Sequence, residues 1–146
     1  MADSPTTEEE ARVYGGSCLC GGVAYRATGP FSVVARCHCV QCRKASGAEY
    51  ATNGSVLREN FEIVRGDDLL SEFESSEGNF RVFCGRCGSP LFKRVDADDS
   101  KIRIRLGTLD DAYAGPVRFR TFTNQKLDLT PLPDDDLMTF ETAPGA

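Results

Sequence analysis

The chain has 146 residues, of which 40% are hydrophobic, 27% charged and 9% aromatic, a composition typical of one globular domain and not of a disordered or low-complexity chain. Because 22 Asp and Glu outnumber 17 Lys and Arg, the net charge is −5, which argues against a surface that binds nucleic-acid phosphates. No run reaches the ~18 apolar residues of a membrane span, and residues 1–10 lack the cationic start and apolar middle of a secretory signal, so we expect a cytoplasmic protein with neither nucleic-acid nor membrane partners.

The chain begins with an acidic segment, residues 1–12, which is predicted to be a flexible tail. Residues 13–141 are predicted to form one β domain, because short β-type runs recur there between Gly, Pro, Asn or Asp residues. Residues 142–146 are predicted to form a C-terminal tail. The predicted strands are Val23–Thr28, Phe31–Cys37, Glu49–Thr52, Phe61–Val64, Leu69–Glu74, Phe80–Cys84, Lys101–Leu106, Val117–Thr123 and Leu137–Phe140.

The clearest strand is Lys101–Leu106, in which charged and apolar side chains alternate as they do in a strand with one face toward water. Val40–Ser46 is predicted to form a short helical turn. No run of ten or more residues repeats apolar positions at helical spacing, and there is no internal repeat of fixed period. The fold class is therefore predicted to be mainly β, a single domain of several short antiparallel sheets.

Seven cysteines dominate the functional interpretation. Their number is odd, so they cannot all pair as disulfides, and a reducing compartment keeps most thiols free. They fall into three short clusters, at 18 and 20, at 37, 39 and 42, and at 84 and 87. Such spacing is typical of thiolate ligands of zinc.

The clusters can be divided between metal ions in two ways. In one division, Cys18, Cys20, Cys84 and Cys87 form a closed four-thiolate site, and Cys37, Cys39 and Cys42 form a second site with one vacant corner. The pair Cys18 and Cys20 is expected to project together from an extended chain. In the other division, the Cys39 and Cys42 pair joins the Cys84 and Cys87 pair in a zinc ribbon, which leaves Cys18, Cys20 and Cys37 spare.

Other polar residues near the cysteines have two readings each. His38 is the single histidine, and strand alternation predicts that it points away from a metal held by its neighbours and serves either in packing or in hydrogen bonding around the metal site. The cations Arg43, Lys44, Arg86 and Lys93 are candidates either to receive a substrate carboxylate or to offset the charge of thiolates.

Three motifs together resemble a known family: Gly16 to Val23 (GSCLCGGV), Cys37 to Gly47 (CHCVQCRKASG) and Phe83 to Phe92 (FCGRCGSPLF). They are similar to the glutathione-dependent formaldehyde-activating enzyme family, which includes relatives of centromere protein V. The resemblance extends from about Tyr14 to Lys126, although the chain has no tryptophan where the family often carries a Ser-Lys-x-Pro-Trp element.

The resemblance implies a tent-like β fold with two zinc ions per chain, one structural and one catalytic. It assigns the structural zinc to Cys18, Cys20, Cys84 and Cys87, and the catalytic zinc to Cys37, Cys39 and Cys42. The predicted activity is that of a carbon-sulfur lyase acting on adducts of a small thiol, such as glutathione, with formaldehyde or a related aldehyde. The alternatives are a zinc-stabilised protein-interaction module without catalysis and a thiol redox or metal-buffering protein, and the sequence leaves a homodimer open.

Overall fold

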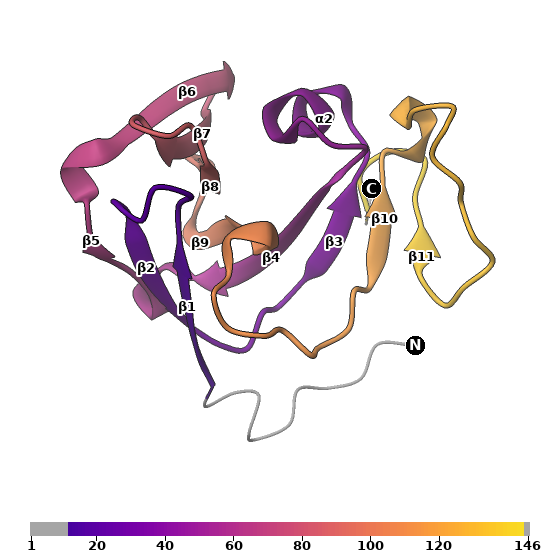
Figure 1. Cartoon of the computed structure of the whole chain (residues 1–146). Coiled ribbons are helices and arrows are strands. Elements are labelled where there is room, and N and C mark those ends of the chain that lie inside the picture. The colour runs from indigo at the N-terminus through magenta and orange to yellow at the C-terminus, as the bar shows by residue number, and fades with distance from the viewer. Residues whose placement is uncertain (1–11, 145–146) are drawn as a thin grey trace.

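The computed structural model describes residues 12–144, which form two β-sheets and one short α-helix (Figure 1). The elements are β1 (Val13–Ser17), β2 (Ala24–Thr28), β3 (Val34–Cys37), α2 (Val40–Ser46), β4 (Ala51–Leu57), β5 (Phe61–Arg65), β6 (Leu70–Ser76), β7 (Asn79–Cys84), β8 (Pro90–Val95), β9 (Asp98–Arg105), β10 (Phe119–Thr121) and β11 (Met138–Thr139). Short 3-10 helices lie at Arg58–Asn60, Asp67–Leu69, Leu106–Thr108 and Thr123–Gln125. The mainly β fold is confirmed. Of the predicted flexible tail at residues 1–12, all but Arg12 lies outside the described residues. The division into tails and domain stays a prediction.

The two sheets differ in size and in strand direction. The smaller one has three antiparallel strands in the order β1-β2-β5. The larger one has eight strands in the order β11-β10-β3-β4-β9-β8-β7-β6, and β10 runs parallel to both β3 and β11. In Figure 1 the smaller sheet lies at the left, and α2 stands at the top beside the end of β3.

One hydrophobic core is shared by both sheets. The smaller sheet contributes Tyr14 and Tyr25, and the larger sheet contributes Val56, Leu91 and Ile104, all of which are almost completely buried. Since burial of each such side chain is worth about 1.5–3 kcal/mol, this core holds the two sheets together. The turns that carry the cysteines extend from its edges.

Strand β9 has one face in the core and one face outside it. Ile102 and Ile104 are buried in the core, and because side chains alternate along a strand, Lys101, Arg103 and Arg105 point to the opposite face. The predicted alternation is confirmed. The charged face, however, lines a cavity rather than open solvent.

Two strands, β1 and β8, were not predicted. Strand β1 contains two glycines, which disfavour a strand, but Gly16 lies opposite Tyr25 in β2 and the tyrosine ring covers it. A Cβ atom on Gly16 would lie 2.1 Å from Cζ of Tyr25. Strand β8 begins at Pro90, a residue that strands tolerate at their first position but that weakens a sequence-based prediction.

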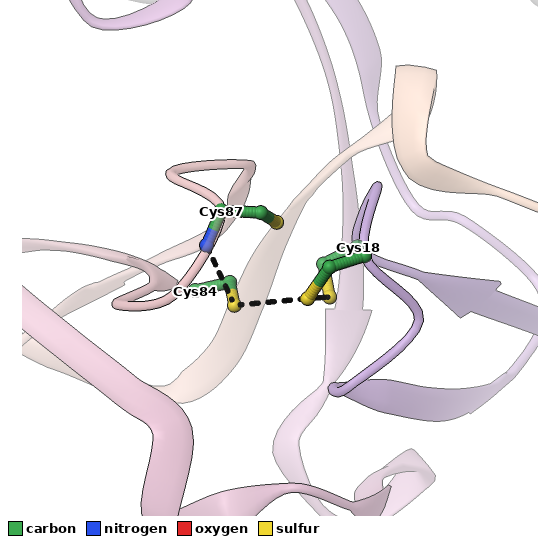
Figure 2. A group of neighbouring side chains, drawn as sticks. Cys18, Cys84 and Cys87 are labelled. Atoms are coloured by element: carbon green, nitrogen blue, oxygen red, sulfur yellow. Dashed lines mark hydrogen bonds between the residues drawn. The ribbon is translucent and has the colours of Figure 1, made fainter.

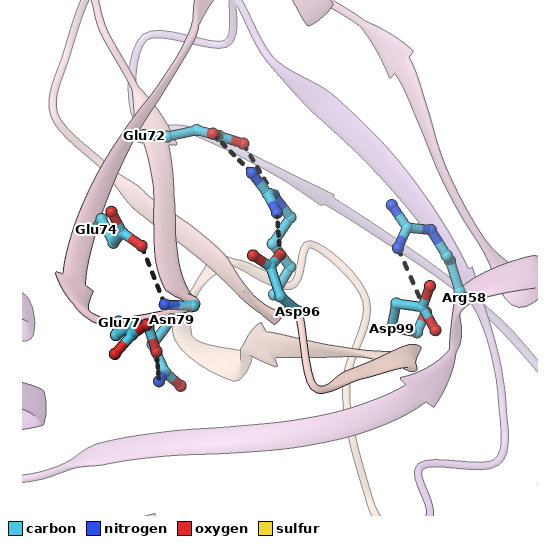
Figure 3. Close-up of polar contacts among 9 residues, drawn as sticks. Arg58, Glu72, Glu74, Glu77, Asn79, Asp96 and Asp99 are labelled. Carbon is cyan, nitrogen blue, oxygen red and sulfur yellow. Dashed lines mark hydrogen bonds and ion pairs between the residues drawn. The ribbon is translucent and has the colours of Figure 1, made fainter.

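Polar contacts fasten the outer strands of the larger sheet (Figure 3). Arg94 of β8 donates hydrogen bonds of 3.1 and 3.0 Å to the carboxylate of Glu72 in β6, and one of 3.0 Å to Asp96. In the turn between β6 and β7, the backbone N–H of Gly78 donates to Glu74 Oε2 at 3.0 Å. These contacts fix the hairpins that carry one of the cysteine pairs.

Candidate metal centres

Four cysteine sulfurs meet where the two sheets adjoin (Figure 2). We call Cys18, Cys20, Cys84 and Cys87 the quartet; all four sulfur atoms lie within 4.8 Å of one another. The Sγ atoms of Cys18 and Cys20 are 3.5 Å apart, and those of Cys20 and Cys84 are 3.9 Å apart. Four sulfurs around zinc at about 2.3 Å in a tetrahedron are separated by about 3.8 Å, so the donor set and its spacing fit a closed zinc site.

The quartet is built from two tight turns, one from each sheet. Cys18 and Cys20 follow β1 in a turn closed by a 3.0 Å hydrogen bond from the Gly21 N–H to the Cys18 carbonyl. The expectation that this pair projects from an extended chain is therefore wrong, because β1 ends at Ser17 and the chain reverses there. Cys84 ends β7 and Cys87 lies in the following turn, where Gly88 has a φ of +82° that favours glycine.

Backbone and side-chain donors surround the quartet sulfurs. The N–H of Val23 donates to Cys18 Sγ at 3.2 Å, and the N–H of Cys87 approaches Cys84 Sγ at 3.5 Å. Arg86 Nε donates to Cys20 Sγ at 3.2 Å, and the Gly22 N–H and this guanidinium lower the pKa of Cys20. The surroundings of Cys20 thus favour its thiolate, the form in which cysteine binds a metal.

The other three cysteines form a second group around the start of α2. We call Cys37, Cys39 and Cys42 the trio; their sulfurs also lie within 4.8 Å of one another. Cys37 ends β3, Cys39 is the N-cap of α2, and Cys42 lies in the first turn of that helix. The predicted short turn at Val40–Ser46 is a true helix, capped by a 3.3 Å hydrogen bond from the Cys42 N–H to Cys39 Sγ.

The pKa values of two trio thiols shift in opposite directions. Hydrogen bonds from the thiols of Cys37 and Cys39 lower the pKa of Cys42, and the charges of Arg105 and Arg81 lower it further. Hydrogen bonds with Cys39 and Cys42, together with burial, raise the pKa of Cys37. The lowered pKa of Cys42 favours its thiolate form, the form in which cysteine binds a metal.

The trio opens onto a cavity of about 530 Å³. All three of its cysteines line this cavity. Five cations share the wall, and among the described residues that line the cavity Asp98 is the one carboxylate; the cations are Arg81, Lys93, Lys101, Arg103 and Arg105. The volume suits a small-molecule ligand, and the wall favours an anion.

The structure separates the cations that the sequence placed together. Lys93 lines the cavity beside the trio, but Arg86 contacts the quartet. Arg43 and Lys44 line a separate surface depression. The prediction that His38 packs is consistent with its burial and with its ring lying 5.1 Å from that of Tyr50.

Sequence reasoning missed Arg81 and Arg105. The signal for Arg105 was present, since Lys101, Arg103 and Arg105 occupy one face of a predicted strand. The alternation predicts a solvated face, because nothing in the sequence indicates what covers it. Arg81 sits in the next strand but one, and only the sheet order brings it to the same wall.

The described residues include no helix that is long and apolar enough to cross a membrane.

The model of the protein family described as glutathione-dependent formaldehyde-activating enzyme matches residues 13–125. A protein from Aspergillus flavus named for the same enzyme is 29% identical over 102 residues, which cover 67% of this chain and 53% of that protein. One from Podospora anserina is 28% identical over 83 residues, or 56% of this chain and 39% of that protein.

The chain thus spans about half the length of the Aspergillus relative, 53%. Among solved structures, a crystal structure of a Rhodobacter sphaeroides protein is similar, with a TM-score of 0.59 and 21% sequence identity. The similarity covers 70% of this chain and 96% of that one. At this identity the similarity establishes a shared fold.

Proposed function

The chain belongs to the glutathione-dependent formaldehyde-activating enzyme family, and we propose that it is a zinc-dependent carbon-sulfur lyase that acts on adducts of a glutathione-like thiol with formaldehyde or a related aldehyde. The observation that carries the proposal is the trio. Its three sulfurs converge on the wall of a cavity, and no fourth His, Cys, Asp or Glu of residues 12–144 joins the group. A substrate can therefore approach the same point as the three thiolates.

The proposal includes two zinc ions per chain, each with its own role. The quartet supplies four thiolates, which complete a tetrahedral site and suit a structural ion. The trio supplies three, which leaves one position for a ligand from solution and suits a catalytic ion. When bound at the trio, zinc supplies a position in which a substrate thiol is stabilised as its thiolate at neutral pH.

The residues of the chain itself have three tasks in this reaction. The trio cysteines would hold the zinc ion, and with it the position of the thiol, at one end of the cavity. The cavity confines the thiol and the aldehyde, which raises their effective concentration. The cations of the wall stabilise the negative charge that grows on the aldehyde oxygen.

The reaction balances without an oxidant or a reductant. A bond forms between the thiol sulfur and the aldehyde carbon, and the carbonyl oxygen takes up the proton that the thiol gives up. The product with formaldehyde is an S-hydroxymethyl thiol. In the lyase direction the same carbon-sulfur bond breaks and the proton returns to sulfur.

Exchange spectroscopy by NMR tests the proposal, because it measures the rate of adduct formation at equilibrium. Zinc-loaded protein should accelerate exchange between glutathione and its formaldehyde adduct above the rate in buffer. Cys39→Ser should abolish the acceleration and lower the zinc content from two ions per chain to one. Absence of any acceleration by fully loaded protein would reject the reaction, and one zinc per chain with a harmless Cys39→Ser would favour the interaction module.

The cytoplasmic location and the exclusion of nucleic-acid and membrane partners remain predictions from composition. The assignment of the trio as catalytic and of the quartet as structural is part of the proposal.

A further inference from the structure

Two buried guanidinium groups stand in the cavity wall beside the trio. Arg81 of β7 is 8% exposed and Arg105 of β9 is 7% exposed. Both line the cavity together with Cys42. Arginine is seldom buried to this degree unless its charge is paired.

Part of each guanidinium has a protein partner and part has none. Arg81 Nη2 donates to Gln41 Oε1 at 3.3 Å, and Arg105 Nη1 donates to Asn53 Oδ1. The Nε and Nη1 atoms of Arg81 and the Nη2 atom of Arg105 are buried without a hydrogen-bond partner among residues 12–144. Both partners are neutral amides, so neither charge is neutralised by them.

The neighbouring residues add positive charge rather than balance it. Across the strands, Arg81 pairs directly with Lys93, and Lys93 pairs directly with Arg103, so three cations form one row. Like charges in opposed positions destabilise a sheet. The carboxylate of Asp98 lies 3.9 Å from Arg103. Asp98, together with the single net negative charge of a zinc ion held by three thiolates, balances only part of the charge on the five cations.

From these contacts we propose that Arg81 and Arg105 bind a carboxylate of the substrate, so that the cavity selects thiols that carry an acid group. A carboxylate matches the planar donor fork of arginine and accepts several hydrogen bonds. The selection of a thiol, as opposed to another acid, rests on the proposed function of the trio. Glutathione has two carboxylates and fits this requirement, whereas its diester and other thiols without a carboxylate do not.

Binding of S-methylglutathione tests the carboxylate site separately from the chemistry, because its sulfur carries a methyl group in place of the proton. Calorimetry with the zinc-loaded protein should give an affinity for this acid about tenfold or more above that for its diethyl ester, as expected for charge-assisted hydrogen bonds. Arg105→Gln and Arg81→Gln should each reduce binding of the acid and leave binding of the ester unchanged. Arg58→Gln is the matched control, since the Arg58 side chain donates a hydrogen bond to the Asp99 carbonyl and is not part of the cavity wall.

The outcomes separate this inference from the proposed function. Equal affinity of the wild-type protein for acid and ester would overturn it. An equal loss of affinity for the acid and for the ester in both arginine variants would also overturn it, because the arginines would then act only on the thiolates or on the fold. If the acid preference holds but adduct formation is not accelerated, the carboxylate site stands and the lyase proposal fails. If the protein accelerates adduct formation equally for glutathione and its diester, the lyase proposal stands and the carboxylate site fails.

Discussion

Removing two ligands from the quartet should cost more folding free energy than removing two ligands from the trio. The matched variants are Cys18→Ser/Cys20→Ser and Cys39→Ser/Cys42→Ser, because each pair contains one buried and one more exposed cysteine. Each variant opens the chain loop that its metal ion closes. The two loops differ greatly in length, and the difference in cost follows from that.

The sulfurs of Cys20 and Cys84 are 3.9 Å apart but 64 positions apart in the sequence, whereas Cys37 to Cys42 spans a few residues of one turn. Treating each metal as a cross-link, the loop-closure entropy lost from the unfolded chain is worth about 4 kcal/mol for the long loop and about 2 kcal/mol for the short one. Against a total stability of about 5–15 kcal/mol, the quartet variant loses a large share. The trio variant should stay folded.

Urea unfolding of the zinc-loaded proteins, followed by circular dichroism, measures this difference. The quartet variant should unfold about 1 M urea below the trio variant, given a typical slope of about 2 kcal/mol per M. With a strong chelator present, wild type and both variants should unfold together, because no loop is then closed. Equal midpoints of the two loaded variants, or a lower midpoint for the trio variant, would refute the division of structural roles.

Three further changes test the fold around the sites. Burial raises the pKa of Tyr25 to about 12 from its usual 10.0. Because the pKa is higher in the folded state, the neutral phenol contributes about 2–3 kcal/mol of stability, which is complete below pH 10 and is lost between pH 10 and 12. Tyr25→Phe should remove this loss when the free energy of unfolding is measured across that pH range. Gly16→Ala should destabilise by about 1–3 kcal/mol in thermal melts, since its new methyl group would overlap the Tyr25 ring, and an unchanged melting temperature would show that the ring moves freely. Asp135→Asn should cost about 2 kcal/mol by chemical unfolding, because Arg120 is 4% exposed and donates to Asp135; a neutral result would mean that solvent replaces the carboxylate.

The sequence identifies the clusters of cysteines, but it does not predict how the clusters combine in space. The C-x-C and C-x-x-C spacings left two divisions open, because spacing along the chain says nothing about which turns meet in space. The structure groups the sulfurs as four and three, and the sheet order explains why: β7 carries Cys84 to the turn after β1, while β3 carries Cys37 to α2.

The cavity wall could not be predicted from local pattern. Alternation along Lys101–Leu106 identified a charged face, and that face exists. Its partner cations come from two other strands, and pairing between strands distant in the sequence depends on the whole topology. Propensity also misled at Gly16, where a tyrosine on the adjacent strand takes the space of the missing side chain.

Strand β7 serves both centres at once. It ends at Cys84 of the quartet, and three residues earlier Arg81 faces the cavity, with Val82 of the core between them. A shift of this strand that loosened the thiol would therefore displace the guanidinium as well. The position of a cavity guanidinium and the position of a quartet sulfur are therefore mechanically linked through three residues of one strand.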